Sequence, residues 1–232
     1  ADTKAVAKWK TSMAARLPVL KAYRTKFREV LMKARSEVLG KLDAKSAPEA
    51  KVRVGAAVDF MFNLLKFDGL LSAAMRGVTE HAIGAAAIQV GDELGESNDP
   101  WKLPSEATQS FLKDRKNKLS GVGPEVFERI RATIAEGVDK GESRDEIAKR
   151  VKAAFSEIED GRAKVIAQTE TGAAFGFGRH AAMEAAGVQW KEWLTSGNTS
   201  TGGGAAAVRA SHRAMQGEIV AINEPFIVTC LE

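Results

Sequence analysis

Residues 143–160 read SRDEIAKRVKAAFSEIED, and their pattern is that of an amphipathic helix with a defined start. Glu146 follows Ser143 by three residues, which is the spacing of a capping box at a helix N-terminus. The apolar residues after it recur at three- and four-residue intervals and form one stripe: Ile147, Val151, Ala154, Phe155 and Ile158. The stretch therefore predicts a helix that packs through one face against a core.

Similar signals lie on both sides of this stretch. Upstream, Pro124 starts a predicted helix that Gly141 ends, with an apolar face of Val126, Phe127, Ile130, Ile134 and Val138. Downstream, Asp160 is predicted to cap a helix over Gly161–Ala186, which Gly187 stops. A shorter helix is predicted from about residue 100 to Asn117.

The first 95 residues predict a separate helical region. Thr3–Leu42 reads as one long helix or two collinear ones, and its apolar stripe is Val19, Tyr23, Phe27, Val30, Leu31, Ala34 and Val38. A second helix is predicted over Ser46–Lys66, a turn at Phe67–Gly69 and a third helix over Leu70–Val90. The acidic, glycine-containing stretch Gly91–Asp99 is taken as the boundary.

The period of the apolar pattern changes after Gly187. Apolar and polar residues alternate from Val188 to Thr195, which predicts a strand, and two more strands are predicted at Glu218–Ile222 and Phe226–Cys230. Ser196–Ala207 is rich in small residues and predicts a loop. The expected fold is mainly α: a helical region at 1–95, then an α+β module at 96–232 with helices over 100–186 and a small antiparallel sheet over 188–232.

The composition indicates a globular protein and argues against a disulfide-stabilised or membrane-spanning one. Apolar residues make up 44% of the 232 residues, enough to bury a core, and the formal net charge of +4 is only mildly basic. The single cysteine, Cys230, excludes an intrachain disulfide. No apolar run reaches the length of a membrane span, so no membrane partner is expected.

One group of polar residues is a candidate site. A helical projection of Gly161–Ala186 places Thr169 and Glu170 on the apolar side of the helix. A buried carboxylate needs a charged or hydrogen-bonding partner, and Arg209 and His212 are the candidates. The favoured interpretation is a structural cluster that ties the helix to the sheet. A catalytic Glu/His pair and a solvent-exposed Glu170 remain the alternatives.

Metal and phosphate sites are not favoured. His180, His212 and Cys230 match no compact zinc spacing, so neither a metal nor a cofactor is expected. Gly172, Gly176 and Gly178 resemble a phosphate loop only superficially, because no strand precedes them, and close helix packing explains them better.

The N-terminal helix carries basic residues around its apolar stripe: Lys21, Arg24, Lys26, Arg28, Lys33 and Arg35. The simpler interpretation is a solvated face beside a packed stripe. The alternative is contact with an acidic partner surface or nonspecific contact with DNA phosphates. Trp190 and Trp193 fall on opposite sides of the predicted strand, so one is expected in the core and the other at an interface.

An ordered set of residues in the last third resembles the C-terminal module of the phage Mu F-like minor head proteins, also called head morphogenesis proteins, of tailed bacteriophages and gene transfer agents. The residues that carry the resemblance are Thr169, Glu170, Trp193, Thr195, Arg209, Ser211, His212 and Gly217. The chain departs from the family pattern at Ser196–Ala207, where a tighter turn is usual, and it lacks the later Cys-x-Cys, which weakens any metal site.

The resemblance implies a non-enzymatic minor capsid protein of a tailed phage or phage-like particle. Such a protein is expected in the virion head near the portal vertex, assembled in the bacterial host cytoplasm, where it assists head assembly, packaging or genome delivery. Its expected partners are the portal protein, the major capsid protein, copies of itself and nonspecific DNA, with residues 1–95 as the docking region. The alternatives are an enzyme or toxin-like transferase or hydrolase using Glu170, Arg209 and His212, and a nonspecific DNA-binding assembly factor.

Overall fold

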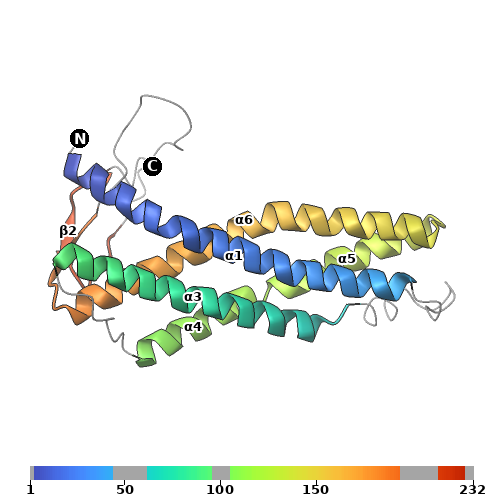
Figure 1. The fold of residues 1–232 in the computed structure, drawn as a ribbon, viewed down its shortest axis with the longest axis horizontal. Coiled ribbons are helices and arrows are strands. Elements are labelled where there is room, and N and C mark those ends of the chain that lie inside the picture. Colours follow the sequence, from blue (N-terminus) through green and yellow to red (C-terminus); the bar gives the residue numbers. More distant parts are fainter. Residues whose placement is uncertain (1–2, 44–61, 96–104, 194–213, 228–232) are drawn as a thin grey trace. The chain divides into compact units, whose positions relative to one another are not determined.

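The computed structural model describes residues 3–43, 62–95, 105–193 and 214–227. Its described elements are the helices α1 (Thr3–Asp43), α3 (Leu64–Leu94), α4 (Ser105–Leu119), α5 (Val122–Asp139) and α6 (Arg144–Ala185) and the strands β1 (Trp190–Glu192) and β2 (Ile219–Ala221) (Figure 1). The predicted fold class, mainly α with a small antiparallel sheet, is confirmed.

Two compact units share these helices. The sheet unit consists of Ala1–Pro18, Ala82–Ser105 and Ala174–Glu232, and the helical unit consists of Val19–His81 and Glu106–Ala173. Each unit therefore draws on both the first 95 residues and the remainder of the chain. The division into these two units differs from the predicted boundary between 1–95 and 96–232, because α1 and α3 pack with the later helices. The prediction that residues 1–95 and 96–232 have separate functions stays a prediction.

Helix α1 buries its predicted stripe in the helical unit. Val19, Tyr23, Phe27, Val30, Leu31 and Val38 are all buried, and only Ala34 is half-exposed. Pro18 lies inside the helix, which continues through it as a single element. The stripe thus faces the core of the helical unit, which also contains the first part of α3, nearly all of α4, the whole of α5 and the first part of α6.

Helix α3 begins where the sequence predicts the end of another helix. The Asn63 side chain accepts a hydrogen bond from the Lys66 backbone N–H at 2.9 Å and so caps the first turn. The predicted turn at Phe67–Gly69 is wrong, because these residues are helical and Phe67 continues a buried row with Leu71 and Met75. The predicted helix at Ser46–Lys66 lies largely outside the described residues.

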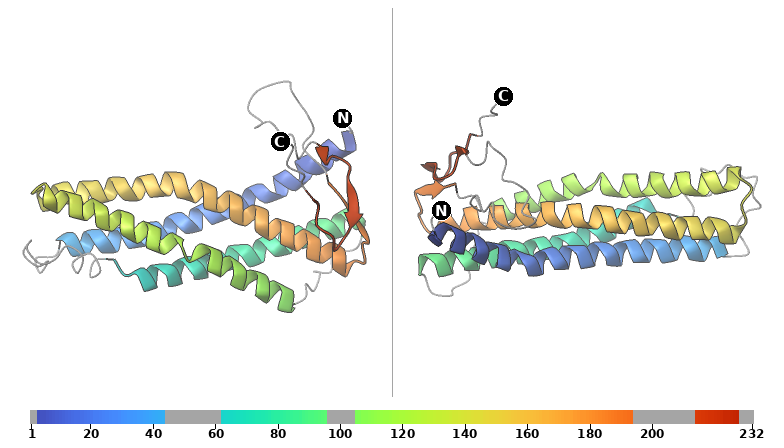
Figure 2. Two further views of the ribbon diagram at one scale, coloured as in Figure 1. Left: turned by 180° about the vertical axis from the view of Figure 1, so that it is seen from behind. Right: turned by 90° about the horizontal axis from the view of Figure 1, so that it is seen from above.

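Helices α5 and α6 run side by side in the helical unit (Figure 2) and are joined by the ion pairs Arg129–Glu157 and Arg162–Glu125. The segment between α5 and α6 confirms the predicted helix stop at Gly141 and the predicted capping box at Ser143 and Glu146. Gly141 adopts φ +68°, and the Glu146 carboxylate accepts the Ser143 backbone N–H at 2.7 Å.

The predicted break at Asp160 is wrong, since α6 runs unbroken from Arg144 to Ala185. Its buried row passes from Ile158 to Ala163 and Ile166. A single glycine inside a helix costs only about 1 kcal/mol relative to alanine. Continued burial outweighs that cost at Gly161.

The sheet follows directly from the end of α6. Gly187, with φ +70°, donates its N–H to the Glu184 carbonyl, and Val188 donates to the Met183 carbonyl, both at 3.0 Å, which is a Schellman motif. Strands β1 and β2 then pair antiparallel, with Lys191 opposite Val220. The predicted third strand is not seen at Phe226 and Ile227, and Val228–Cys230 lie outside the described residues.

Candidate functional site

Glu170 lies buried in the helical unit, with 3% of its surface exposed, as the helical projection predicted. Its partner is Arg115 of α4, which is 8% exposed. The Arg115 Nε donates to Glu170 Oε2 at 2.9 Å and Nη2 donates to Oε1, so both carboxylate oxygens are held in a two-pronged ion pair. The hydrogen bonds with Glu170 raise the pKa of Arg115 above its usual value, which keeps the guanidinium charged.

Arg115 is a site residue that the sequence prediction missed, although its position in the apolar pattern of α4 indicates burial. Arg115 follows buried Leu112 by three residues and precedes buried Leu119 by four, so it occupies the apolar stripe of α4. A cation in an apolar stripe requires a buried anion. The long separation of 55 residues hid which anion it was.

The predicted phase of α6 around Glu170 needs a correction. Thr169 is exposed, whereas Thr171 is buried, and the buried row continues through Ala174 and Phe175. Threonine flanks Glu170 on both sides, at Thr169 and Thr171, so the residue types next to Glu170 do not define the inward direction there.

Tyr23 and Thr79 form a second buried hydrogen-bonded pair in the helical unit. The Tyr23 ring of α1 is fully buried, and its hydroxyl lies 2.7 Å from Thr79 Oγ1 of α3. The Thr79 hydroxyl donates its only proton to the Met75 carbonyl at 2.8 Å, so the Tyr23 hydroxyl donates to Thr79. Burial raises the pKa of Tyr23 to about 12, with the nearby Glu170 carboxylate as a smaller cause in the same direction.

Tyr23 is the only tyrosine in the chain, so its ionisation can be followed by tyrosinate absorbance without interference from another tyrosine. We expect a native titration midpoint near pH 12, against about 10 in denaturant. Below pH 10 both states keep the proton. Between pH 10 and 12 only the unfolded state loses it, so the free energy of unfolding falls with pH in that window. A native midpoint at the denatured value, with circular dichroism still native, would contradict the burial of this hydroxyl.

In the sheet unit, the signature residues Trp193 and Gly217 meet across the hairpin. Gly217, with φ +81°, donates its N–H to the Trp193 carbonyl at 2.9 Å, and the Trp193 N–H donates to the Glu218 carbonyl at 2.9 Å. The left-handed φ explains glycine at this turn. The Trp193 ring packs edge-on against Phe226, with ring centroids 5.2 Å apart, and is partly buried, whereas Trp190 is 62% exposed. Neither tryptophan lies fully in the core.

His180 connects α6 to the end of the hairpin. Its Nε2 donates to the Ile222 carbonyl at 2.9 Å, and that oxygen also accepts from Lys191 Nζ at 2.8 Å. Its Nδ1 lies 3.2 Å from Glu184 of the same helix. Across the described ranges, no three His, Cys, Asp or Glu side chains gather to hold a metal ion.

Four of the predicted site residues, Thr195, Arg209, Ser211 and His212, lie outside the described residues, as does Cys230. The approach of Arg209 or His212 to Glu170 therefore stays a prediction. In the helical unit, Arg115 alone already occupies both oxygens of the Glu170 carboxylate.

The predicted basic residues of α1 differ in their surroundings. Lys21, Arg24, Lys26, Arg28 and Lys33 are exposed, and Arg35 is half-buried. Arg28 forms an ion pair with Glu159, and Lys26 forms one with Glu29 at 2.8 Å. Acidic neighbours thus neutralise part of this charge, and contact with DNA or an acidic partner stays a prediction.

Only one of the three glycines discussed above makes a close helix contact. In the sheet unit, a Cβ placed on Gly178 of α6 would lie 2.6 Å from the Ile83 carbonyl oxygen of α3. Equivalent atoms on Gly172 and Gly176 would meet nothing within 4 Å. Close packing is therefore the role of Gly178.

The fold and these contacts define a helical protein with a buried Arg115–Glu170 ion pair and a two-stranded antiparallel sheet. Residues 128–230 match the protein family described as phage Mu protein F like protein. This region, which includes Glu170, Trp193 and Gly217, is therefore similar to the phage Mu F-like proteins, in agreement with the resemblance seen in the sequence. No curated protein and no solved structure gives a significant match. A Mu F-like domain indicates a phage head morphogenesis protein, and the family is one of structural head proteins.

Proposed function

We propose that the chain is a minor capsid protein of a tailed phage or phage-like particle, that it assembles with the portal or major capsid protein, and that it has no catalytic role. The observation that carries the proposal is the family match over residues 128–230. The match supports a role in the virion head, where the protein would assist assembly, packaging or genome delivery.

The geometry around Glu170 supports a non-enzymatic role. A catalytic carboxylate must reach substrate, but both oxygens of Glu170 are held by Arg115 and the side chain is almost wholly buried. Neither of the two cavities described below is lined by Glu170 or Arg115. The enzyme alternative, with Glu170, Arg209 and His212 as the site, would require the ion pair to open.

The remaining partner predictions fit the surface of α1. Exposed Lys21 and Arg24 are available for phosphate or carboxylate contacts, which supports nonspecific DNA as a secondary partner. A search of the helices in the described part of the chain finds none that could cross a membrane.

A quantitative protein inventory of purified particles tests the proposal. We expect the protein at a small fixed copy number beside the portal and major capsid proteins, and cross-links from it to one of the two. Particles made without the gene should show a defect in head assembly, packaging or genome delivery that the gene supplied in trans repairs. A protein absent from wild-type particles would contradict the proposal.

The Glu170→Gln variant separates this role from catalysis. Glutamine preserves the shape of the side chain but leaves Arg115 without a charged partner, so we expect lower stability than wild type and normal incorporation of the folded fraction. Full stability and full incorporation together with loss of particle function would instead favour the enzyme alternative.

A further inference from the structure

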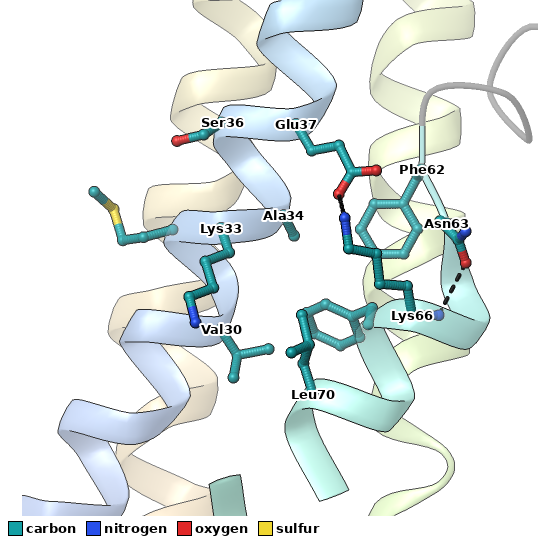
Figure 3. Close-up of a pocket in the computed structure, with 11 residues that line it drawn as sticks. Val30, Lys33, Ala34, Ser36, Glu37, Phe62, Asn63, Lys66 and Leu70 are labelled. Atoms are coloured by element: carbon teal, nitrogen blue, oxygen red, sulfur yellow. Dashed lines mark hydrogen bonds and ion pairs between the residues drawn. The ribbon is translucent and has the colours of Figure 1, made fainter. Parts of the chain in front are cut away.

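A groove runs between α1 and α3 on the outside of the helical unit. It consists of two adjoining cavities of about 490 and 540 Å³ that share Val30, Lys33 and Leu70. Figure 3 shows Val30 of α1 and Leu70 of α3 pointing toward one another, with Glu37 reaching across the opening to Lys66. The floor of the groove is apolar and built largely from small side chains: Ala22, Ala73, Ala74, Gly77 and Val78.

Charges of alternating sign follow the α1 edge of this groove. Lys26, Glu29, Lys33 and Glu37 are spaced by three, four and four residues, so they share one face of the helix, and all four line the cavities. Lys26 and Glu29 are about half exposed. The edge therefore carries a regular pattern of charges that a partner can reach.

This pattern is complementary to itself in one orientation only. If a second α1 helix lies antiparallel, with a two-fold axis midway between Glu29 and Lys33, Glu29 faces Lys33 of the second copy and Lys33 faces its Glu29. Lys26 then lies within about one residue of the position opposite Glu37 of the second copy. A parallel arrangement in register would place like charges together, which is repulsive. Two-fold, self-complementary contacts are the usual form of a homodimer interface.

The floor of the groove leaves space for such a contact. A Cβ placed on Gly77 would meet nothing within 4 Å, so no part of the described chain fills the position above it. Small residues on both helices let a neighbouring helix approach closely and bury the apolar floor.

We infer that the groove between α1 and α3 is the docking surface for a second copy of this chain, with the α1 helices antiparallel and held by reciprocal Glu29–Lys33 ion pairs. The inference is independent of the role in the particle, because it concerns the purified protein alone. It identifies the surface through which one copy would contact another.

Analytical ultracentrifugation of the full chain over a range of concentrations tests the inference through charge reversal. Glu29→Lys and Lys33→Glu should each weaken dimerisation at least about tenfold, because each change creates like-charge contacts at two symmetric places. The double variant Glu29→Lys/Lys33→Glu should regain dimerisation, since the swapped charges pair again. Most diagnostic is an equimolar mixture of the two single variants, which should form the heterodimer although neither forms a homodimer.

Arg24→Glu is the matched control. Arg24 is exposed and lies nine residues from Lys33, which places it on the opposite side of α1, and its reversal changes the net charge as much as Lys33→Glu does. We expect it to leave dimerisation unchanged. Gly77→Met provides an uncharged test, because its side chain extends into the groove from a position where a Cβ meets nothing within 4 Å, and the change removes a helix-weakening glycine. It should give a well-folded monomer.

Three results would overturn the inference. The first is a wild-type chain that stays monomeric at every concentration. The second is a dimer that Glu29→Lys, Lys33→Glu and Gly77→Met all leave intact, since its interface must then lie elsewhere. The third is loss of dimerisation in both single variants without recovery in their mixture, because reciprocal pairing requires that recovery. Circular dichroism of each variant confirms that the helices are intact.

Discussion

Arg115→Ala is expected to lower the free energy of unfolding by about 3–5 kcal/mol, the usual cost of removing one partner from a buried ion pair. The cost arises because the Glu170 carboxylate, 3% exposed, would lose both of its hydrogen-bond donors and stay away from water. Urea unfolding monitored by circular dichroism measures the change, provided that the slope of the transition is preserved.

Two further variants show whether the loss comes from the stranded charge. Replacing both residues, Arg115→Met with Glu170→Leu, removes the charges together and should cost much less than Arg115→Ala alone. Lys118→Ala on the same helix breaks the exposed pair with Asp114, whose side chains are 59% and 52% exposed, and should cost less than about 1 kcal/mol. Equal losses for Arg115→Ala and Lys118→Ala would show that Glu170 is not buried in solution.

Gly178→Ala should destabilise the protein by about 1–3 kcal/mol through overpacking in the sheet unit. The new Cβ would lie 2.6 Å from the Ile83 carbonyl oxygen and 3.0 Å from the Ile83 Cα, so the backbone of α3 would have to move. A rigid helix backbone cannot turn aside as a flexible side chain could. Thermal and urea unfolding of the full chain report the loss.

Gly176→Ala, two residues away on α6, should have the opposite sign. Its Cβ meets nothing within 4 Å, so the variant gains helix propensity of up to about 1 kcal/mol with no clash. The two variants have the same chemistry and the same helix, and only the distance to α3 differs. If both were stabilising, the close approach of α3 and α6 at Gly178 would be contradicted.

The sequence predicted helix ends correctly where the end depends on residues that are close together in the chain. The capping box at Ser143 and Glu146 and the stops at Gly141 and Gly187 are confirmed, because side-chain capping and positive φ depend on nearby residues alone. The expected breaks at Phe67–Gly69 and Asp160 were wrong, since turn-forming residues carry a weak preference that burial along α3 and α6 overrides.

Some features of the candidate site were likewise predictable from the sequence, and others depend on the tertiary structure. The sequence predicted that Glu170 would be buried and would need a cationic partner, and the resemblance around Trp193 and Gly217 predicted the family match over residues 128–230. The tertiary structure decided that the partner is Arg115, that Tyr23 and Thr79 form the second buried pair, and that Gly178 rather than Gly176 touches α3. The physical reason is the sequence separation of the interacting residues. The periodicity of apolar residues indicates which side of a helix is buried, whereas the identity of a buried residue's partner depends on how helices far apart in the chain pack together.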